Sequence, residues 1–150
     1  MPGDPRIDAG MQAAIEEARK GLAAGGIPIG SALVRDGRIL ATGHNKRVQH
    51  GCPVTHAEIE CLRNAGRIAG NFRGATLYST LMPCYLCAGA AVQFGVARVV
   101  VGESRNFPGA PEFMRLHRIE VIDLDLPECV EMMADFIRDQ PALWHEDIGV

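Results

Sequence analysis

The chain has 150 residues, of which 47% are hydrophobic and 22% charged, and its formal net charge is −3. This length and composition predict one soluble domain and exclude an intrinsically disordered chain, because apolar residues are plentiful and the net charge is small. The weakly acidic balance argues against binding to nucleic acid or another polyanion. The sequence contains neither an apolar run of the roughly 20 residues that span a membrane nor the amino-terminal apolar core of a secretory signal.

Hydrophobic periodicity predicts helices that alternate with strands along the chain. In chain order, the predicted elements are a helix over residues 11–22, strands at 29–35 and 38–43, a helix over 55–65, a strand at 75–80, a helix opening at 83, a strand at 97–102, a short helix at 111–117, a strand at 118–124, a helix with an apolar stripe from 126 to 137, and a tail from 141. The pair Asp36-Gly37 predicts a tight hairpin between the first two strands. The alternation of strands and helices predicts an α/β layered domain, and the hairpin makes its sheet mixed. The length of the chain predicts that residues 1–150 form one such domain.

The number and spacing of the cysteines indicate metal chemistry. Five cysteines are an odd number for a disulfide scaffold, and Cys84 and Cys87 are too close in sequence for a simple structural bridge. This usage favours a reducing compartment, which predicts a cytoplasmic protein. Cys52, Cys61 and Cys129 are interpreted as free thiols.

A Cys-x-x-Cys pair at the start of a predicted helix directs two sulfurs into one site, where the positive end of the helix favours thiolates. With His56, the two residues Cys84 and Cys87 form a set of one imidazole and two thiolates, for which zinc is the natural occupant. A structural zinc site usually has four protein ligands. Because the sequence offers three, the fourth position is predicted to hold water or hydroxide, as in catalytic zinc sites.

Glu58 lies two residues after His56, at the first turn of a predicted helix, from which a carboxylate can reach a metal-bound water. We therefore predict that Glu58 is a general acid and base. The combination of His-Ala-Glu at 56–58 with Pro-Cys-x-x-Cys at 83–87 is the signature of zinc deaminases, in which the Glu is not a ligand. Two alternatives stay open: Glu58 could close a capping box with Thr55, and the cysteine pair could be a redox pair or a structural zinc knuckle.

With these motifs established, the chain resembles the cytidine-deaminase-like superfamily, and within it the fungal-type cytosine deaminases. The resemblance runs from about residue 8 to residue 149. It is carried by GIPIG at 26–30, GHN at 43–45, HAE at 56–58, NAGR at 64–67, TLMPC at 80–84, VGE at 101–103 and the tail WHEDIG at 144–149. The metal motif is common to the whole superfamily, whereas the tail is much more specific to the cytosine-deaminase branch.

The resemblance implies a three-layer α/β/α fold with a five-stranded mixed sheet, a homodimer, and one Zn²⁺ per chain. It assigns the metal ligands to His56, Cys84 and Cys87, and the proton shuttle to Glu58. It places the substrate-binding residues at Asn45, Ala57, Leu81, Phe107, Trp144 and Asp147. Residues 141–150 are then expected to close the active site as a carboxy-terminal tail. By residue type alone, Asn45 is a turn residue and Asp147 a solvated carboxylate.

The expected activity is zinc-dependent hydrolysis of a free nucleobase, cytosine being converted to uracil and ammonia, with neither nucleic acid nor membrane as a partner. Ala57 stands where the family has Gly, Met82 where it has Ser and His145 where it has Phe. These departures leave isocytosine, guanine or a related cyclic amidine open as substrates. A tRNA adenosine deaminase shares His-Ala-Glu, but the low basicity argues against it. A catalytically silent zinc module that binds a macromolecule is the alternative from a different class.

Overall fold

The computed structural model describes residues 3–67 and 71–150. Its elements, in chain order, are α1 (Ala9–Ala23), β1 (Gly30–Arg35), β2 (Arg38–His44), α2 (Arg47–His50), α3 (Ala57–Ala65), β3 (Thr76–Ser79), α4 (Tyr85–Gln93), β4 (Arg98–Val101), α5 (Pro111–Leu116), β5 (Glu120–Asp123), α6 (Pro127–Asp139) and α7 (Pro141–Ile148). The alternation of helices and strands confirms the predicted α/β class. In the described part of the chain, no helix is both long and apolar enough to cross a membrane.

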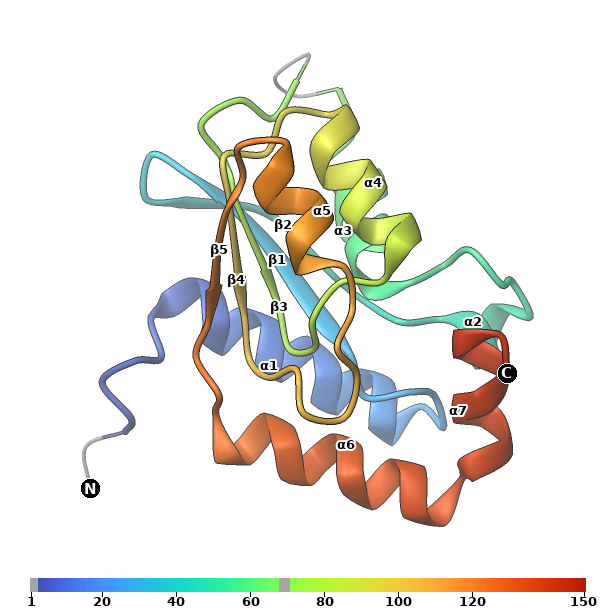
Figure 1. Cartoon of the computed structure of the whole chain (residues 1–150). Helices are drawn as coiled ribbons and strands as arrows, with labels where there is room; N and C mark the ends of the chain where they lie inside the picture. The colour runs from blue at the N-terminus through green and yellow to red at the C-terminus, as the bar shows by residue number, and fades with distance from the viewer. Residues whose placement is uncertain (1–2, 68–70) are drawn as a thin grey trace.

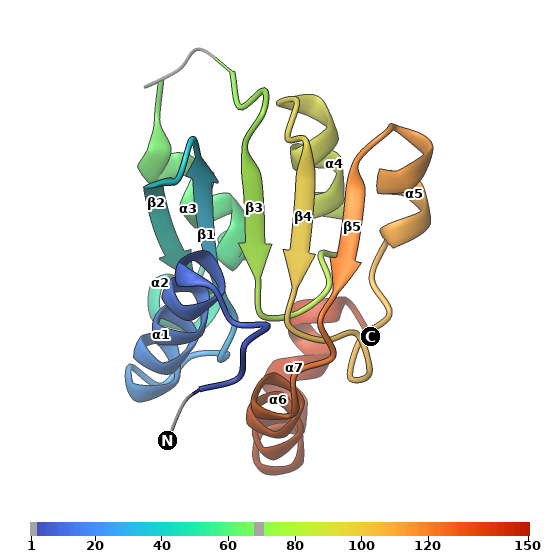
Figure 2. The ribbon, with the colours of Figure 1, turned by 90° about the vertical axis from the view of Figure 1, so that its left-hand side faces the viewer.

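The strands form a five-stranded mixed sheet in the order β2-β1-β3-β4-β5. β1 pairs antiparallel with β2 and β3, whereas β3, β4 and β5 run parallel to one another. Helices α1 and α6 lie on one side of the sheet and α3, α4 and α5 on the other (Figure 1 and Figure 2), which confirms the three-layer fold. Asp36 and Gly37 both have positive φ, 53° and 74°, as a type I′ hairpin turn requires.

The two helices that carry the candidate site begin later than predicted. The N-cap of α3 is His56, not Thr55, and α4 begins at Tyr85 with Cys84 as its N-cap, two residues after Pro83. The reason is that the carbonyls of the predicted starting residues are used elsewhere. The Thr55 carbonyl accepts a hydrogen bond from the Lys46 amide at 3.0 Å, and the Pro83 carbonyl accepts one from the Ala110 amide at 2.9 Å.

Two short helices lie in segments for which the sequence predicted neither a helix nor a strand. The four-residue helix α2 has no buried residue, so it carries no apolar periodicity that a sequence pattern could reveal. Helix α7 forms most of the predicted tail. It begins at Pro141, which suits the first turn of a helix, and it buries the side chain of Trp144 against the rest of the protein.

Each strand turns alternate side chains toward the two helical layers, as the pleat of a sheet requires. Residues such as Leu77 and Val99 pack with the layer of α3, α4 and α5, whereas Tyr78 and Val100 pack with the layer of α1 and α6. A third apolar cluster joins α6 and α7 to the loops at the strand ends and contains Ile27, Ile29, Ala57, Leu81, Met133, Phe136 and Trp144. This third cluster lies next to the candidate site.

The contact between α1 and β1 depends on the absence of a side chain at Gly30. A Cβ atom added there would lie 1.9 Å from the Ala14 carbonyl oxygen and 2.4 Å from the Ala18 amide nitrogen, both backbone atoms that cannot turn aside. We expect Gly30→Ala to lower the free energy of unfolding by about 3 kcal/mol, the upper end of overpacking effects. Chemical denaturation measures this change, and the control is Gly89→Ala, where the new Cβ meets nothing within 4 Å. Equal stability of the two variants would contradict the close approach.

Candidate metal and catalytic site

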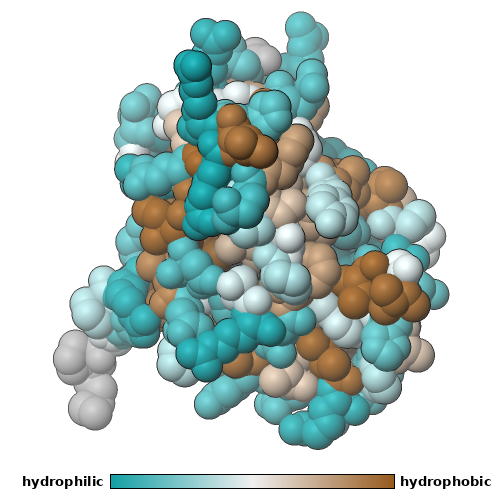
Figure 3. All heavy atoms as spheres, in the orientation of Figure 1, coloured by the Kyte–Doolittle hydropathy of each residue, from teal (hydrophilic) through white to brown (hydrophobic). Residues whose placement is uncertain are grey.

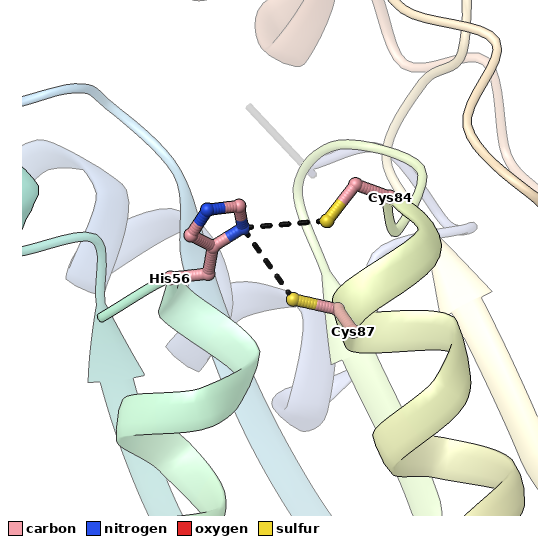
Figure 4. A group of neighbouring side chains, drawn as sticks. All are labelled: His56, Cys84 and Cys87. Carbon is pink, nitrogen blue, oxygen red and sulfur yellow. Dashed lines mark hydrogen bonds between the residues drawn. The ribbon is translucent and has the colours of Figure 1, made fainter. Parts of the chain in front are cut away.

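Three metal-ligating side chains converge where α3 and α4 begin. The Nδ1 atom of His56 lies 3.4 Å from the Sγ of Cys84 and 3.6 Å from the Sγ of Cys87. All three ligand atoms lie within 4.8 Å of one another. Figure 4 shows the imidazole reaching from the start of α3 toward the two sulfurs at the start of α4. The structure thus brings together the three residues that the sequence predicts as ligands.

The spacing of these atoms suits a tetrahedral zinc ion. With Zn–S bonds of about 2.3 Å and Zn–N bonds of about 2.0–2.1 Å at the tetrahedral angle, a nitrogen and a sulfur ligand lie about 3.6 Å apart. The two measured separations of 3.4 Å and 3.6 Å agree with that value. The donors are one imidazole and two sulfurs, the ligand types that zinc prefers. The site therefore suits one zinc ion on both geometry and chemistry.

The charges within this group favour a thiolate. The hydrogen bond from Cys87, together with the one from His56, lowers the pKa of Cys84 to about 4 against the effect of burial. Burial disfavours the charged form of His56, but the hydrogen bond to Cys84 and the charge of Asp147 outweigh it and raise the pKa of His56 to about 9. Burial raises the pKa of Cys87. The lowered pKa of Cys84 favours its thiolate, which is the form that binds metals.

Glu58 lies at the first turn of α3 with only 4% of its surface exposed. Burial raises the pKa of its carboxyl group, although hydrogen bonds from Cys87 and Ser79 oppose that rise. The capping-box alternative for Glu58 is wrong, because His56 and not Thr55 is the N-cap of α3. Instead, Glu58 Oε1 accepts a hydrogen bond from the Ser79 hydroxyl at 2.6 Å. The sequence analysis missed Ser79, which has the pattern of an ordinary buried strand residue.

A narrow cavity of about 30 Å³ is lined by Glu58 and by two of the three ligand residues, His56 and Cys84. A cavity needs roughly 10–15 Å³ to hold one water molecule, so this cavity is small. The lining residues are Ile29, Asn45, His56, Ala57, Glu58, Leu81, Met82, Cys84, Phe107, Trp144, Asp147 and Ile148. The structure therefore gathers all six predicted substrate-binding residues around one space. Ile148 lies in the tail that was expected to close the site. Ile29 was not predicted, because an isolated apolar residue carries no signal of a site.

Asn45 and Asp147 lie side by side in the cavity although they are far apart in sequence. The Oδ1 atom of Asn45 accepts a hydrogen bond from the Arg47 amide at 2.9 Å, so the Nδ2 atom is the one that faces Asp147 Oδ1, at 3.4 Å. The same Asp147 oxygen lies 3.6 Å from Nε2 of His56, the ring nitrogen that faces away from the sulfurs. Burial raises the pKa of Asp147, opposed by the charge of His56 and the Asn45 hydrogen bond. A donor and an acceptor thus converge on one edge of the cavity.

Two aromatic side chains form another wall of the cavity. The rings of Phe107 and Trp144 meet edge to face, with centroids 5.8 Å apart. Phe107 lies in the loop between β4 and α5, which is held by the fully buried Glu103: its two carboxylate oxygens accept hydrogen bonds from the amide and the side chain of Asn106, both at 2.9 Å. The loop and α7 are thereby packed against each other over the cavity.

The three departures from the cytosine-deaminase pattern fall in different places. Ala57 and Met82 are buried and line the cavity, so both bear on the shape of a bound molecule. His145 is exposed on α7 and lies outside the lining of the cavity. Selectivity is therefore expected to depend on Ala57 and Met82.

An ion pair ties α7 to the segment that carries Asn45. The Nε atom of Arg47 lies 3.2 Å from a carboxylate oxygen of Glu146, and its Nη1 atom donates to the Pro53 carbonyl at 3.3 Å. We expect Arg47→Ala to raise the KM of a reaction in this cavity by at most about fivefold with little change in kcat, since partly exposed pairs contribute roughly 0.2–1 kcal/mol. Steady-state kinetics measures this change. The control is Arg98→Ala, which breaks an ion pair with Glu120 at the starts of β4 and β5. A KM shift of equal size in this control would contradict the role of Arg47.

Comparison with known proteins identifies relatives of the chain. Residues 5–103 match the family model described as the zinc-binding region of cytidine and deoxycytidylate deaminases. The chain is 42% identical to a cytosine deaminase of Candida albicans over 142 residues, which cover 93% of this chain and 95% of the relative. It is 34% identical to a tRNA-specific adenosine deaminase of Streptococcus pyogenes over 139 residues, covering 85% and 87% of the two chains. A structure from a study of A-to-I editing by tRNA:A34 deaminases superposes with a TM-score of 0.73 at 32% identity, covering 82% of this chain and 97% of the other.

The matched region includes every residue of the converging group: the three side chains that suit zinc, and Glu58 beside them. The relatives match over most of their own length, so the similarity is not confined to a short motif. This chain therefore belongs to the cytidine and deoxycytidylate deaminase family of zinc-dependent enzymes.

Proposed function

We propose that this protein deaminates a free nucleobase by hydrolysis and that cytosine is its substrate, giving uracil and ammonia. The observation that carries the proposal is the narrow cavity, which is lined by Glu58, by the ligand residues His56 and Cys84, and by hydrogen-bonding groups for one small ring. The 42% identity to a cytosine deaminase supports the choice of base. We also propose that residues 1–150 form a single deaminase domain.

In this proposal His56, Cys84 and Cys87 hold the zinc ion, which supplies a water of lowered pKa when it is bound. Glu58 would take one proton from the attacking water and pass it to ring nitrogen N3 of the base as the C4–O bond forms. It would then take the remaining proton from the new C4 hydroxyl and deliver it to the amino group, which leaves as ammonia when the C4–N4 bond breaks. Its burial suits this work, since a carboxyl group with a raised pKa can both accept and donate near neutral pH.

The remaining residues orient the ring. Asn45 offers its Nδ2 hydrogens, because its oxygen is already engaged by the Arg47 amide. Asp147 offers an acceptor for a ring or amino hydrogen, and its side chain is only 3% exposed. The rings of Phe107 and Trp144, with Leu81 and Ala57, enclose the base and exclude water. Exclusion of water strengthens each of these polar contacts.

The size of the cavity favours a free base over a nucleoside or a nucleic acid. Trp144, Asp147 and Ile148 of α7 all line it, so the helix closes one side of the pocket and leaves little room for a ribose. Removal of residues 144–150 should abolish turnover while zinc remains bound, because the three ligand residues lie elsewhere in the chain. Zinc analysis and ammonia release test this, with removal of the exposed residues 149–150 as the control. A folded, fully active protein that lacks residues 144–150 would refute the closing role of α7.

Ammonia release from the zinc-loaded protein tests the proposed activity. The panel is cytosine, isocytosine, guanine, adenine, creatinine and cytidine, with Glu58→Ala as the blank. We expect cytosine to give the highest kcat/KM. Faster release from cytidine than from any free base would overturn the substrate class. Absence of ammonia from every compound would contradict the activity and favour a catalytically silent zinc module.

Isocytosine is the second candidate substrate, on the evidence of two residues that line the cavity. Ala57 and Met82 are 0% and 3% exposed, and each is larger than the residue expected in the cytosine deaminases. They narrow the pocket around one ring, which disfavours the two-ring guanine more than isocytosine. In the double variant Ala57→Gly and Met82→Ser, the kcat/KM for cytosine is expected to rise relative to the kcat/KM for isocytosine.

We further propose that the protein is a cytoplasmic homodimer. Helices α4 and α5 expose Tyr85, Leu86, Phe113 and Leu116, and Figure 3 shows hydrophobic side chains at the surface in this region. Helices α4 and α5 contact each other, and exposed apolar side chains that gather in one region are typical of a protein interface. All five cysteines lie in the described part of the chain and none of them is in a disulfide, which suits a reducing compartment. Light scattering of the wild type and of Leu116→Glu tests the dimer, since the charge should shift it toward a monomer.

A further inference from the structure

Ser79 is a buried polar residue beside the catalytic acid that the sequence analysis did not assign. It is the last residue of β3, it is 0% exposed, and its hydroxyl oxygen lies 2.6 Å from Oε1 of Glu58. The same oxygen lies 2.8 Å from the carbonyl oxygen of Leu81, the residue that follows Thr80 on the way to the metal-ligand helix. One hydroxyl thus bridges the acid on α3 and the loop that precedes α4.

The strand geometry explains why Ser79 reaches Glu58. Side chains alternate along β3, so Leu77 and Ser79 point toward the layer that contains α3, while Tyr78 points to the opposite layer. Ser79 pairs with Ser31 of β1, which fixes it in a central position of the sheet. A strand in the middle of a sheet is a rigid support, so the hydroxyl is held in place more firmly than a loop residue would be.

A carboxylate that moves protons needs one oxygen for the reaction and the other held still. The Cys87 sulfur is the other side chain that hydrogen-bonds to Glu58, but as a metal ligand it would be a thiolate without a proton to donate. The Ser79 hydroxyl keeps one donor and two acceptor sites. It can therefore donate to Oε1 or to the Leu81 carbonyl, and it stays hydrogen-bonded whether or not Glu58 carries a proton.

We propose that Ser79 is a positioning residue that holds Oε1 of Glu58 and leaves Oε2 to carry the proton. This role rests on the proposed deaminase function. Ser79 lies outside the lining of the cavity, so it acts on the reaction through Glu58 and not through contact with the base. Its loss should accordingly lower kcat and leave KM nearly unchanged, because substrate binding in the ground state does not involve it.

The test compares Ser79→Ala with Ser31→Ala in the zinc-loaded enzyme. Both remove a fully buried hydroxyl at one paired position of the sheet, but the Ser31 hydroxyl donates to the Tyr78 carbonyl at 2.6 Å and does not touch Glu58. We expect Ser79→Ala to lower kcat by about 10- to 100-fold, the range that a misplaced catalytic group costs. We expect KM within about twofold of the wild type, unchanged zinc content, and nearly wild-type kinetics for Ser31→Ala.

Ser79→Thr, which keeps a hydroxyl at the same place, should restore most of kcat. If Ser79→Ala does not fold, Ser79→Cys replaces it, because a thiol keeps the shape and is only a weak donor; the same loss of kcat is expected. Wild-type kcat in the Ala or Cys variant, or equal losses in Ser79→Ala and Ser31→Ala, would overturn the role. An active wild type with these outcomes refutes only the role of Ser79, whereas an inactive wild type refutes the proposed function and this role with it.

Discussion

Glu58→Gln should lower ammonia release by about 100- to 10,000-fold, the range over which a positioned acid or base contributes. The amide has the same shape as the carboxyl group, but it can neither take a proton from water nor deliver one to the base. The side chain is 4% exposed, so solvent has little access with which to replace it. Because the zinc ligands are His56, Cys84 and Cys87, the zinc content of the variant should stay at one ion per chain.

Steady-state ammonia release and zinc analysis on the same preparations measure both parts of this expectation. The chain offers a matched control in Glu60, which lies two residues after Glu58 on α3. Glu60 is also buried, and it forms ion pairs with Lys46 and Arg63. Glu60→Gln is expected to cost stability and little of kcat. If Glu58→Gln kept the kcat of the wild type, the proton shuttle would have to be another group.

Cys87→Ser should strip the protein of zinc and of activity together. A serine hydroxyl at this place is a much poorer ligand than a thiolate, and only His56 and Cys84 would remain to hold the ion. Changes in groups that merely support metal ligands weaken binding by about 10- to 100-fold, so the loss of a ligand itself should exceed that range. Competition with a chelator followed by metal analysis gives the change in affinity.

Cys52→Ser is the control for the cysteine substitution. Cys52 is a free thiol outside the converging group, and it is partly exposed. It should keep one zinc ion and wild-type turnover. Chelation of the wild type should abolish activity, and added zinc should restore it. Full activity in a Cys87→Ser protein without zinc would contradict the assignment of the metal site.

The sequence by itself determined those features that depend on short spacings. Asp36-Gly37 specifies a hairpin because both positions need positive φ, which this pair tolerates. The ligand pair and the motif around Glu58 could be recognised because each lies within one turn of a helix start. The order of helices and strands follows from hydrophobic periodicity, and with it the α/β class. The five-stranded sheet and the residues expected to bind the substrate were predicted from resemblance to a family, not from periodicity.

Only the tertiary structure decided how these pieces meet. Thr55 and Pro83 do not begin their helices, because amides of Lys46 and Ala110 from other segments occupy their carbonyls. Asn45 and Asp147 are 102 positions apart and become neighbours only when α7 folds over the cavity.

Ser79 likewise meets Glu58 through the pleat of β3 and the packing of α3 on the sheet. Local sequence sets the conformation of a residue and its nearest neighbours along the chain. Contacts between distant segments depend on how the layers pack, and no local pattern encodes that arrangement.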